Sequence, residues 1–153
     1  MRLWRLSGKQ HADMFDGDYG LLFDGRWNSV GHAITYCATS PALCVLEKLV
    51  HIEDPALLPD LVMVTYDVPG ALDAEIVALG DLPQDWTRQE TWTQARGNAW
   101  HRSRASCMLK VPSAIVPLEG SPDVNVLINH DHPAARTITI TAAEPFVLDA
   151  RLF

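Results

Sequence analysis

A cation, an aromatic ring and a carboxylate follow one another closely in the first third of the chain. Arg26 lies in the run 25–28 (GRWN), Tyr36 in the next apolar run, and Glu47 beyond a Ser-Pro pair. A guanidinium grips phosphate bidentately, an aromatic face attracts a cationic ring, and a carboxylate stabilises an oxocarbenium-like centre. Together they predict a pocket for a phosphorylated, positively charged heteroaromatic compound. NAD meets that description.

Each of these residues also has an ordinary structural interpretation. The residues around Arg26 are typical of a surface turn, and Trp27 and Tyr36 could both be aromatic residues of the core. Glu47 lies near the edge of a helical apolar stripe and could be solvated or paired with Lys48. The residues taken one at a time leave both interpretations open.

Later polar residues add weaker signals. Ser113 has no Gly-x-Ser-x-Gly elbow around it, so a pocket hydroxyl is favoured over a hydrolase nucleophile. Asn125 and Asn129 flank an apolar run and are typical of strand ends and turns. The pair His130 and His132 lacks the further ligands that zinc needs, and we expect no metal site.

Familiar nucleotide motifs are missing from the sequence. The run 7–9 (SGK) lacks the upstream glycine and spacing of a P-loop, and no Gly-x-Gly-x-x-Gly occurs. A bound dinucleotide would therefore not be held in the Rossmann manner. Cys44 or Cys107 as a nucleophile with a distant histidine stays an alternative, although apolar surroundings raise the pKa of a thiol and make it inert.

Composition predicts one cytoplasmic domain over residues 1–153. The chain is 48% hydrophobic, enough for one sizeable core, and its net charge of −7 argues against a general nucleic-acid binder. No apolar run approaches the roughly 20 residues of a membrane helix, and no signal-peptide pattern opens the chain. The three cysteines form no CxxC pair and are expected to be reduced thiols.

The elements that must position the candidate residues follow from periodicity and turn signals. Ser40 is a predicted N-cap with Pro41 at the first helical position, opening a helix to about residue 52 that carries Glu47. A second helix is expected over 91–107, with Trp92, Ala95, Ala99 and Ser103 on one side. Strands are expected over 1–6, 33–37, 61–68, 109–116 with an interruption at Pro112-Ser113, 124–129, 137–141 and 145–149, with loops over 13–31 and 71–86.

Strands outnumber helices in this prediction, and they do not alternate with helices regularly. The fold class expected is α+β, a single compact domain with a mostly antiparallel β core and flanking helices. A doubly wound sheet is disfavoured for the same reason.

The ordered set of segments resembles a RES domain over essentially the whole chain. The opening matches through the run 25–28, Tyr36, Ser40-Pro41 and Glu47. Later matches follow in order: Leu82-Pro83-x-x-Trp86, Trp100, Leu109-x-Val111-Pro112-Ser113, Asn125-x-Leu127-x-Asn129, His132-Pro133, Pro145-Phe146 and Asp149-x-Arg151-Leu152.

This resemblance implies a fold similar to the catalytic core of ADP-ribosyltransferases and an attack on NAD, as substrate, at its nicotinamide–ribose bond. It assigns catalysis to Arg26, Tyr36 and Glu47. The contacts to NAD would come from Arg26, Trp27, Asn28, Tyr36, Ser113 and Asn125. His130 stands where the family usually has proline, and the stretch 120–123 is longer than its typical loop.

The resemblance also implies a toxin of a bacterial toxin–antitoxin pair. Its partner would be an Xre-type antitoxin that covers the active site in a hetero-oligomer, with no direct contact to nucleic acid or membrane. The acceptor of ADP-ribose stays open among water, phosphate and a protein. A non-catalytic nucleotide-binding or antitoxin-binding module, and a stand-alone NAD hydrolase, are the alternatives.

Overall fold

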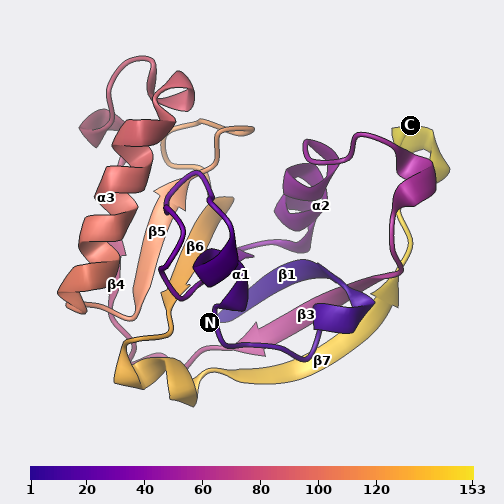
Figure 1. Ribbon diagram of the computed structural model, residues 1–153, viewed down its shortest axis with the longest axis horizontal. Helices are drawn as coiled ribbons and strands as arrows, with labels where there is room; N and C mark the ends of the chain where they lie inside the picture. The colour runs from indigo at the N-terminus through magenta and orange to yellow at the C-terminus, as the bar shows by residue number, and fades with distance from the viewer.

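One seven-stranded sheet runs through the protein, in the order β4-β5-β6-β2-β1-β3-β7 (Figure 1). The computed structural model describes residues 1–153. All neighbouring strands are antiparallel except β4 and β5. The strands are β1 (Arg2–Gly8), β2 (Ile34–Ala38), β3 (Leu61–Asp67), β4 (Ala74–Ile76), β5 (Met108–Pro112), β6 (Val124–Asn129) and β7 (Thr139–Phe146).

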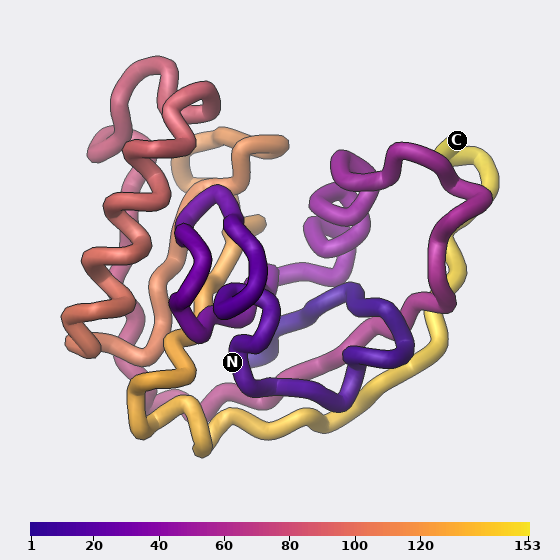
Figure 2. Tube along the Cα trace, in the orientation of Figure 1, coloured from indigo at the N-terminus to yellow at the C-terminus, as the bar shows by residue number.

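The sheet has two halves that meet at β1 and β2. These two strands pair only at Trp4 and Ala38, whereas β1 pairs with β3 along its whole length and β2 pairs with β6 throughout. The helices α2 (Pro41–Leu49) and α3 (Glu90–Ser103) stand apart from each other, as the trace in Figure 2 shows. The α+β prediction with a mostly antiparallel core is confirmed.

Three apolar clusters fill the space around the sheet. Under α3 and the loop before β2 lie Trp27, Ile34, Val77, Trp86, Trp100, Leu109, Val111 and Leu127. Under α2 lie Ala38, Leu43, Cys44 and Met63. The opposite face of the sheet carries the largest cluster, made by Leu3, Ala12, Cys37, Val62, Val64, Tyr66, Val68, Cys107, Met108, Val126, Ile128, Ala135 and Ile138.

Helix α2 begins as its sequence predicts. The Ser40 hydroxyl accepts a hydrogen bond from the Leu43 amide at 3.2 Å, and the same hydroxyl donates to Asp123 at 2.6 Å. Its buried residues are Leu43 and Cys44, while Leu46 on the same predicted stripe is 38% exposed. The first half of the helix is therefore packed against the sheet, and its second half is more exposed to solvent.

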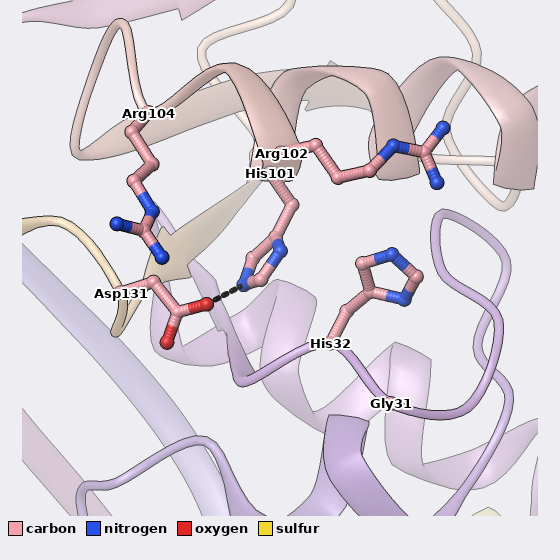
Figure 3. A pocket seen from close by; sticks show the side chains of 6 residues that line it. All are labelled: Gly31, His32, His101, Arg102, Arg104 and Asp131. Carbon is pink, nitrogen blue, oxygen red and sulfur yellow. Dashed lines mark ion pairs between the residues drawn. The ribbon is translucent and has the colours of Figure 1, made fainter.

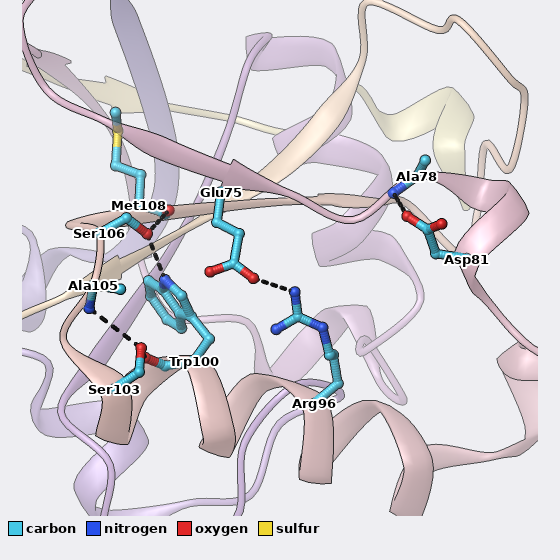
Figure 4. A network of polar contacts seen from close by, with 9 residues as sticks. All are labelled: Glu75, Ala78, Asp81, Arg96, Trp100, Ser103, Ala105, Ser106 and Met108. Atoms are coloured by element: carbon cyan, nitrogen blue, oxygen red, sulfur yellow. Dashed lines mark hydrogen bonds and ion pairs between the residues drawn. The ribbon is translucent and has the colours of Figure 1, made fainter.

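Helix α3 is held to the sheet by polar contacts (Figure 4). The Trp100 indole donates to the Ser106 hydroxyl at 2.9 Å, which donates onward to the Met108 carbonyl at 3.0 Å, and Arg96 pairs with Glu75 of β4. The predicted packing side was wrong. The buried residues of α3 are Thr93, Gly97, Asn98, Trp100 and His101, because Gly97 packs directly against the chain at Trp27.

Several element predictions were also wrong. The expected loop 13–31 contains the short helix α1 (Asp18–Leu22), where Gly20 packs so closely on the His32 carbonyl that a Cβ would lie 2.3 Å from it. The expected loop 71–86 contains β4, and β5 ends at Pro112 instead of continuing. Two expected strands near the C-terminus form the single edge strand β7, where Pro145 is tolerated because one side is unpaired.

No helix of the structure has both the length and the apolar character that crossing a bilayer requires.

Candidate active site

The turn that carries Arg26 is closed by its own backbone and by α3. The Gly25 amide donates to the Asn28 carbonyl at 2.9 Å. From α3, the Thr93 hydroxyl donates to the Arg26 carbonyl at 2.5 Å and the Gln94 amide group donates to the Gly25 carbonyl at 2.9 Å. The backbone of residues 25–28 is therefore fixed before any ligand arrives.

The same helix holds the segment after Arg26. The Asn98 side chain accepts from the Ser29 amide at 3.1 Å and donates to the Ser29 hydroxyl at 2.8 Å. Gly97 leaves no room for a side chain, since a Cβ there would lie 1.8 Å from the Trp27 carbonyl oxygen. Close approach of α3 thus depends on a glycine at this position.

Tyr36 ties the turn to the sheet. Its hydroxyl accepts from the Trp27 amide at 3.0 Å and donates to the Asn28 side chain at 2.6 Å. Burial raises the pKa of Tyr36 well above its usual range, because the phenolate would be poorly solvated. The hydroxyl is neutral and committed to the turn, so Tyr36 has only its ring to offer a ligand.

The Arg26 guanidinium carries a charge that no carboxylate neutralises. It donates to the Thr87 carbonyl at 3.1 Å, and its central carbon lies 5.7 Å from the ring centroid of Trp86. Arg26 makes none of the ion pairs in the protein, and its side chain is half-buried. A cation held by a neutral carbonyl and a ring face is suited to bind an anion.

Glu47 is held through one of its two carboxylate oxygens. Its Oε1 accepts from the Ser113 hydroxyl at 3.0 Å and from the Asn125 side-chain amide at 2.6 Å. The Ser113 oxygen also accepts from the amides of Ile115 and Val116, so its single proton points to Glu47. Oε2 accepts no hydrogen bond, and Glu47 is half-buried with no basic partner.

The strand register brings the predicted residues to one face of the sheet. Tyr36 lies opposite Leu127, and Ala38 opposite Asn125, so Tyr36 and Asn125 point to the same side. Ser113 follows β5 on that side by alternation from Val111, which pairs with Asn125. One cluster joins Glu47, Ser113 and Asn125, and a second joins Arg26, Trp27, Asn28 and Tyr36.

Not all the predicted residues offer side chains to a ligand. Trp27 is 1% exposed and Asn28 fully buried, and both side chains support the turn from within. Ser113 is also fully buried, with its hydroxyl committed to Glu47. Of the predicted residues, Arg26, Tyr36, Glu47 and Asn125 are half-buried and keep part of their side chains exposed.

Sequence reasoning missed the contribution of α3. Thr93, Gln94, Gly97 and Asn98 position the turn, yet none of them is apolar and none belongs to the predicted packing side. The signal that could have found them is a stripe of small and polar residues at helical spacing, which marks a close helix–loop contact.

No cysteine or histidine side chain is hydrogen-bonded to Arg26, Tyr36 or Glu47. Cys37, Cys44 and Cys107 are all buried, and desolvation raises the pKa of Cys107 to about 11 and that of the other two to about 12. His130 bonds with the Thr35 hydroxyl at 2.8 Å and packs against Phe15. No three His, Cys, Asp or Glu side chains converge as metal ligands.

Comparison with known proteins identifies what this chain is similar to. "Toxin Res" of Pseudomonas putida is 36% identical over the full length of both chains, and "Toxin Res" of Photorhabdus laumondii is 34% identical over 99% of this chain and 97% of its own. "Prs ADP-ribosylating toxin" of a Sphingobium species is 34% identical over 97% of this chain and 94% of its own.

Among solved structures, the M. tuberculosis MbcT-MbcA toxin-antitoxin complex contains a chain with the same fold. The TM-score is 0.76 over 95% of this chain and 84% of that one, at 19% identity. The RES domain family matches residues 2–149, and the chain therefore belongs to the RES domain family.

Proposed function

We propose that this protein is the toxin of a toxin–antitoxin pair, and that it cleaves the nicotinamide–ribose bond of NAD and passes ADP-ribose to an acceptor. The observation that carries the proposal is the Glu47 carboxylate, held through one oxygen with the other left free. The names of the relatives, "Toxin Res" and "Prs ADP-ribosylating toxin", support the same class of activity.

Glu47 stabilises the positive charge that develops on the ribose. Its Oε2 accepts a hydrogen bond from a ribose hydroxyl, and its negative charge lies beside the anomeric carbon as that carbon becomes oxocarbenium-like. Ser113 and Asn125 hold the carboxylate from behind, so it need not reorganise during the reaction.

Arg26 and Tyr36 hold the two ends of the reacting half of NAD. The unpaired guanidinium of Arg26 binds the pyrophosphate, and the ring of Tyr36 stacks on the nicotinamide. The Tyr36 hydroxyl continues to hold the turn, so the stacking ring and the phosphate-binding cation are positioned by one network.

The bond changes need little help from an acid. The C1′–N bond breaks and its electron pair neutralises the pyridinium nitrogen, so nicotinamide leaves as a neutral molecule. An acceptor O–H forms the new C1′–O bond and releases its proton to solvent. Positioning and charge stabilisation are the main requirements, and the site supplies both.

Nicotinamide release from NAD tests this proposal. We expect the wild type to release nicotinamide and Glu47→Gln to lose most of that activity, since the amide is isosteric but uncharged. Glu53→Gln is the matched control, because Glu53 is an exposed glutamate just beyond α2. Full turnover by Glu47→Gln would refute the role of the carboxylate.

The same assay distinguishes among phosphate, water and a protein as the acceptor of ADP-ribose. Release that depends on added phosphate indicates phosphorolysis, and release in its absence indicates hydrolysis. Release that appears only with cell lysate, together with labelled protein, indicates transfer to a protein acceptor. Binding of NAD without release under all three conditions would instead favour a non-catalytic module.

An Xre-type antitoxin is the proposed partner, covering the face that carries Arg26 and Glu47. The fold shared with a chain of a toxin–antitoxin complex favours such a partner over a stand-alone hydrolase. We expect the assembled pair to cleave NAD more slowly than the free protein, and equal rates would refute the covering of the site.

A further inference from the structure

The connection between β5 and β6 ends in an aspartate that contacts the start of α2. The Asp123 carboxylate is half-buried, and its Oδ1 accepts a hydrogen bond from the Ser40 hydroxyl at 2.6 Å. Asp123 makes none of the protein's ion pairs. It belongs to the stretch 120–123, which is longer than the loop typical of RES domains, and the proposed reaction does not use it.

The Asp123 carboxylate orients the N-cap of α2. The Ser40 hydroxyl has one proton, and the contact at 2.6 Å assigns that proton to Asp123. A lone pair of the same oxygen is then left to accept from the Leu43 amide at 3.2 Å. Helix α2 has no acidic residue in its own first turn, and Asp123 supplies a negative charge at the end where the backbone dipole favours one. Asp123 therefore stabilises the start of α2 from outside the helix.

Thr39 attaches the same end of α2 to the same segment. Its hydroxyl donates to the Pro122 carbonyl at 2.7 Å and accepts from the Val124 amide at 3.0 Å. Its own amide donates to the Val124 carbonyl at 3.1 Å. The Ser121 hydroxyl accepts from the Asp123 amide at 3.1 Å and so holds the backbone just before β6. The start of α2 and the start of β6 are thus joined by main-chain and side-chain contacts together.

Helix α2 is attached to this segment at two points. The first is Ser40, which is bonded to Asp123, and the second is Glu47, whose Oε1 accepts from Asn125 at 2.6 Å. The two points are about two helical turns apart, a rise of roughly 10 Å. Only two residues of α2 are buried, and both lie between these points. The direction of the helix axis, and with it the place of the free Oε2 of Glu47, therefore depends on both attachments.

The other end of β6 shows a weaker form of the same arrangement. Asp131 follows β6 and faces α3, where its Oδ2 lies 3.6 Å from Nε2 of His101, too far for a hydrogen bond (Figure 3). Helix α3 does not depend on that contact, because hydrogen bonds and an ion pair along its length hold it to the sheet and to the Arg26 turn. Helix α2 has no such set of contacts, since Glu47 is its only hydrogen-bonded side chain beyond the cap.

We propose that Asp123 is a positioning residue for the reaction: through Ser40 it fixes the direction of α2 and so the place of the free carboxylate oxygen of Glu47. The inference rests on the proposed function, which takes Glu47 as the group that stabilises the ribose. Loss of the Asp123 carboxylate leaves Glu47 attached to Asn125 and Ser113. The helix can then pivot about that attachment, and the oxygen that meets the ribose is displaced.

The side-chain amide resonance of Asn125 reports the place of Glu47 without any NAD. Its NH2 group donates to Glu47 at 2.6 Å, and the chemical shift of a hydrogen-bonded proton changes with the geometry of the bond. We expect Asp123→Ala to move this resonance in the NMR spectrum. Ser40→Ala should move it in the same direction, although Asp123 is then intact. Asp123→Asn keeps an oxygen that accepts from Ser40, and its resonance should lie near that of the wild type.

Nicotinamide release from NAD then measures the consequence for the reaction, at a temperature well below the melting point of each variant. We expect Asp123→Ala to lower kcat about fivefold, as one weakened hydrogen bond would, and to leave KM within about twofold of wild type. A shortage of folded protein would not be corrected by Asp123→Asn at equal folded concentration, whereas positioning predicts that this variant recovers most of kcat. Glu119→Ala is the matched control, because it removes an exposed carboxylate from the same connection.

Two results would overturn the inference. One is an Asn125 side-chain resonance that Asp123→Ala moves no further than Glu119→Ala does. The other is an equal kcat of Asp123→Ala and Glu119→Ala in a protein whose wild type releases nicotinamide. If the wild type releases none while Asp123→Ala still moves the resonance, the proposed function fails and the placement of Glu47 by Asp123 stands.

Discussion

Replacement of Gly97 by alanine tests whether α3 fixes the Arg26 turn. Helix propensity alone predicts a gain of about 1 kcal/mol from Gly→Ala within a helix. The structure predicts the opposite sign, because the new Cβ would lie 1.8 Å from the Trp27 carbonyl oxygen and 2.8 Å from its carbonyl carbon. An ordinary contact is near 3.4 Å, so the helix and the turn must separate by more than an ångström.

That separation loosens the contacts that flank Gly97. The bonds from Thr93 to the Arg26 carbonyl, from Gln94 to the Gly25 carbonyl and from Ser29 to Asn98 all lengthen. Overpacking costs about 1–3 kcal/mol and each weakened hydrogen bond about 1 kcal/mol. After the propensity gain is subtracted, we expect a net loss of about 3–5 kcal/mol in the free energy of unfolding.

Denaturant unfolding and thermal unfolding measure this loss. For a chain of this length, the expected fall in the melting temperature is roughly 10 °C. Gly80→Ala is the matched control, because no atom lies within 4 Å of the Cβ it would add, and its stability should not fall. A Gly97→Ala variant as stable as the wild type would refute the close-contact argument, and in that case the turn owes its shape to Tyr36 alone.

Four further variants test other parts of the molecule. Asn125→Ala removes a hydrogen bond to the Glu47 carboxylate, which is worth about 1.5–3 kcal/mol, and we therefore expect a 10- to 100-fold lower kcat for NAD cleavage. Ser113→Ala removes the other hydrogen bond and should have a similar effect. An unchanged kcat would show that Glu47 needs no support from these two residues. Burial lowers the pKa of His130 to about 4, below its value in the unfolded chain, so the unfolded chain takes up the proton first and stability is lost as the pH falls from about 6.5 to about 4. His130→Gln should remove about 3 kcal/mol of that pH dependence in denaturant titrations, and a curve parallel to the wild type would contradict it. Arg104 has a positive φ, and Arg104→Gly should relieve about 1 kcal/mol of backbone strain and so raise the melting point. A lower melting point would mean that the Arg104 side chain stabilises the fold.

The parts of the fold with strong local signals could be predicted from the sequence. The Ser-Pro start of α2 and the β-branched run of β3 are determined by local chemistry, and both appear where expected. The short elements α1 and β4 could not be predicted, because they are stabilised by contacts from distant segments. Strand β4 consists of three residues and exists by pairing in parallel with β5.

The same distinction applies to the site. Residue type and order predict the candidate cation, ring and carboxylate, but they do not predict which atoms of these groups lack a protein partner. The Tyr36 hydroxyl bonds with the turn at Trp27 and Asn28. This contact depends on the strand register that places Tyr36 opposite Leu127, and the sequence does not reveal that register. That Ser113 and Asn125 serve Glu47 depends on three segments meeting in space. Trp100 is the one large apolar residue among the buried residues of α3, so hydrophobic periodicity could not identify the packing side of this helix.

The narrow join between β1 and β2 gives the Glu47 carboxylate a mechanical role. The two halves of the sheet share one residue pair at that join, and Glu47 belongs to α2, which packs over the join on residues of β1, β2 and β3. Its bonds to Ser113 and Asn125 reach the other half. The carboxylate thus links the two halves of the sheet across the join between β1 and β2. The two halves are candidates for units that open separately in amide hydrogen exchange. A motion of the two halves relative to each other would strain or break these two bonds, and the position of the Glu47 carboxylate would change with them.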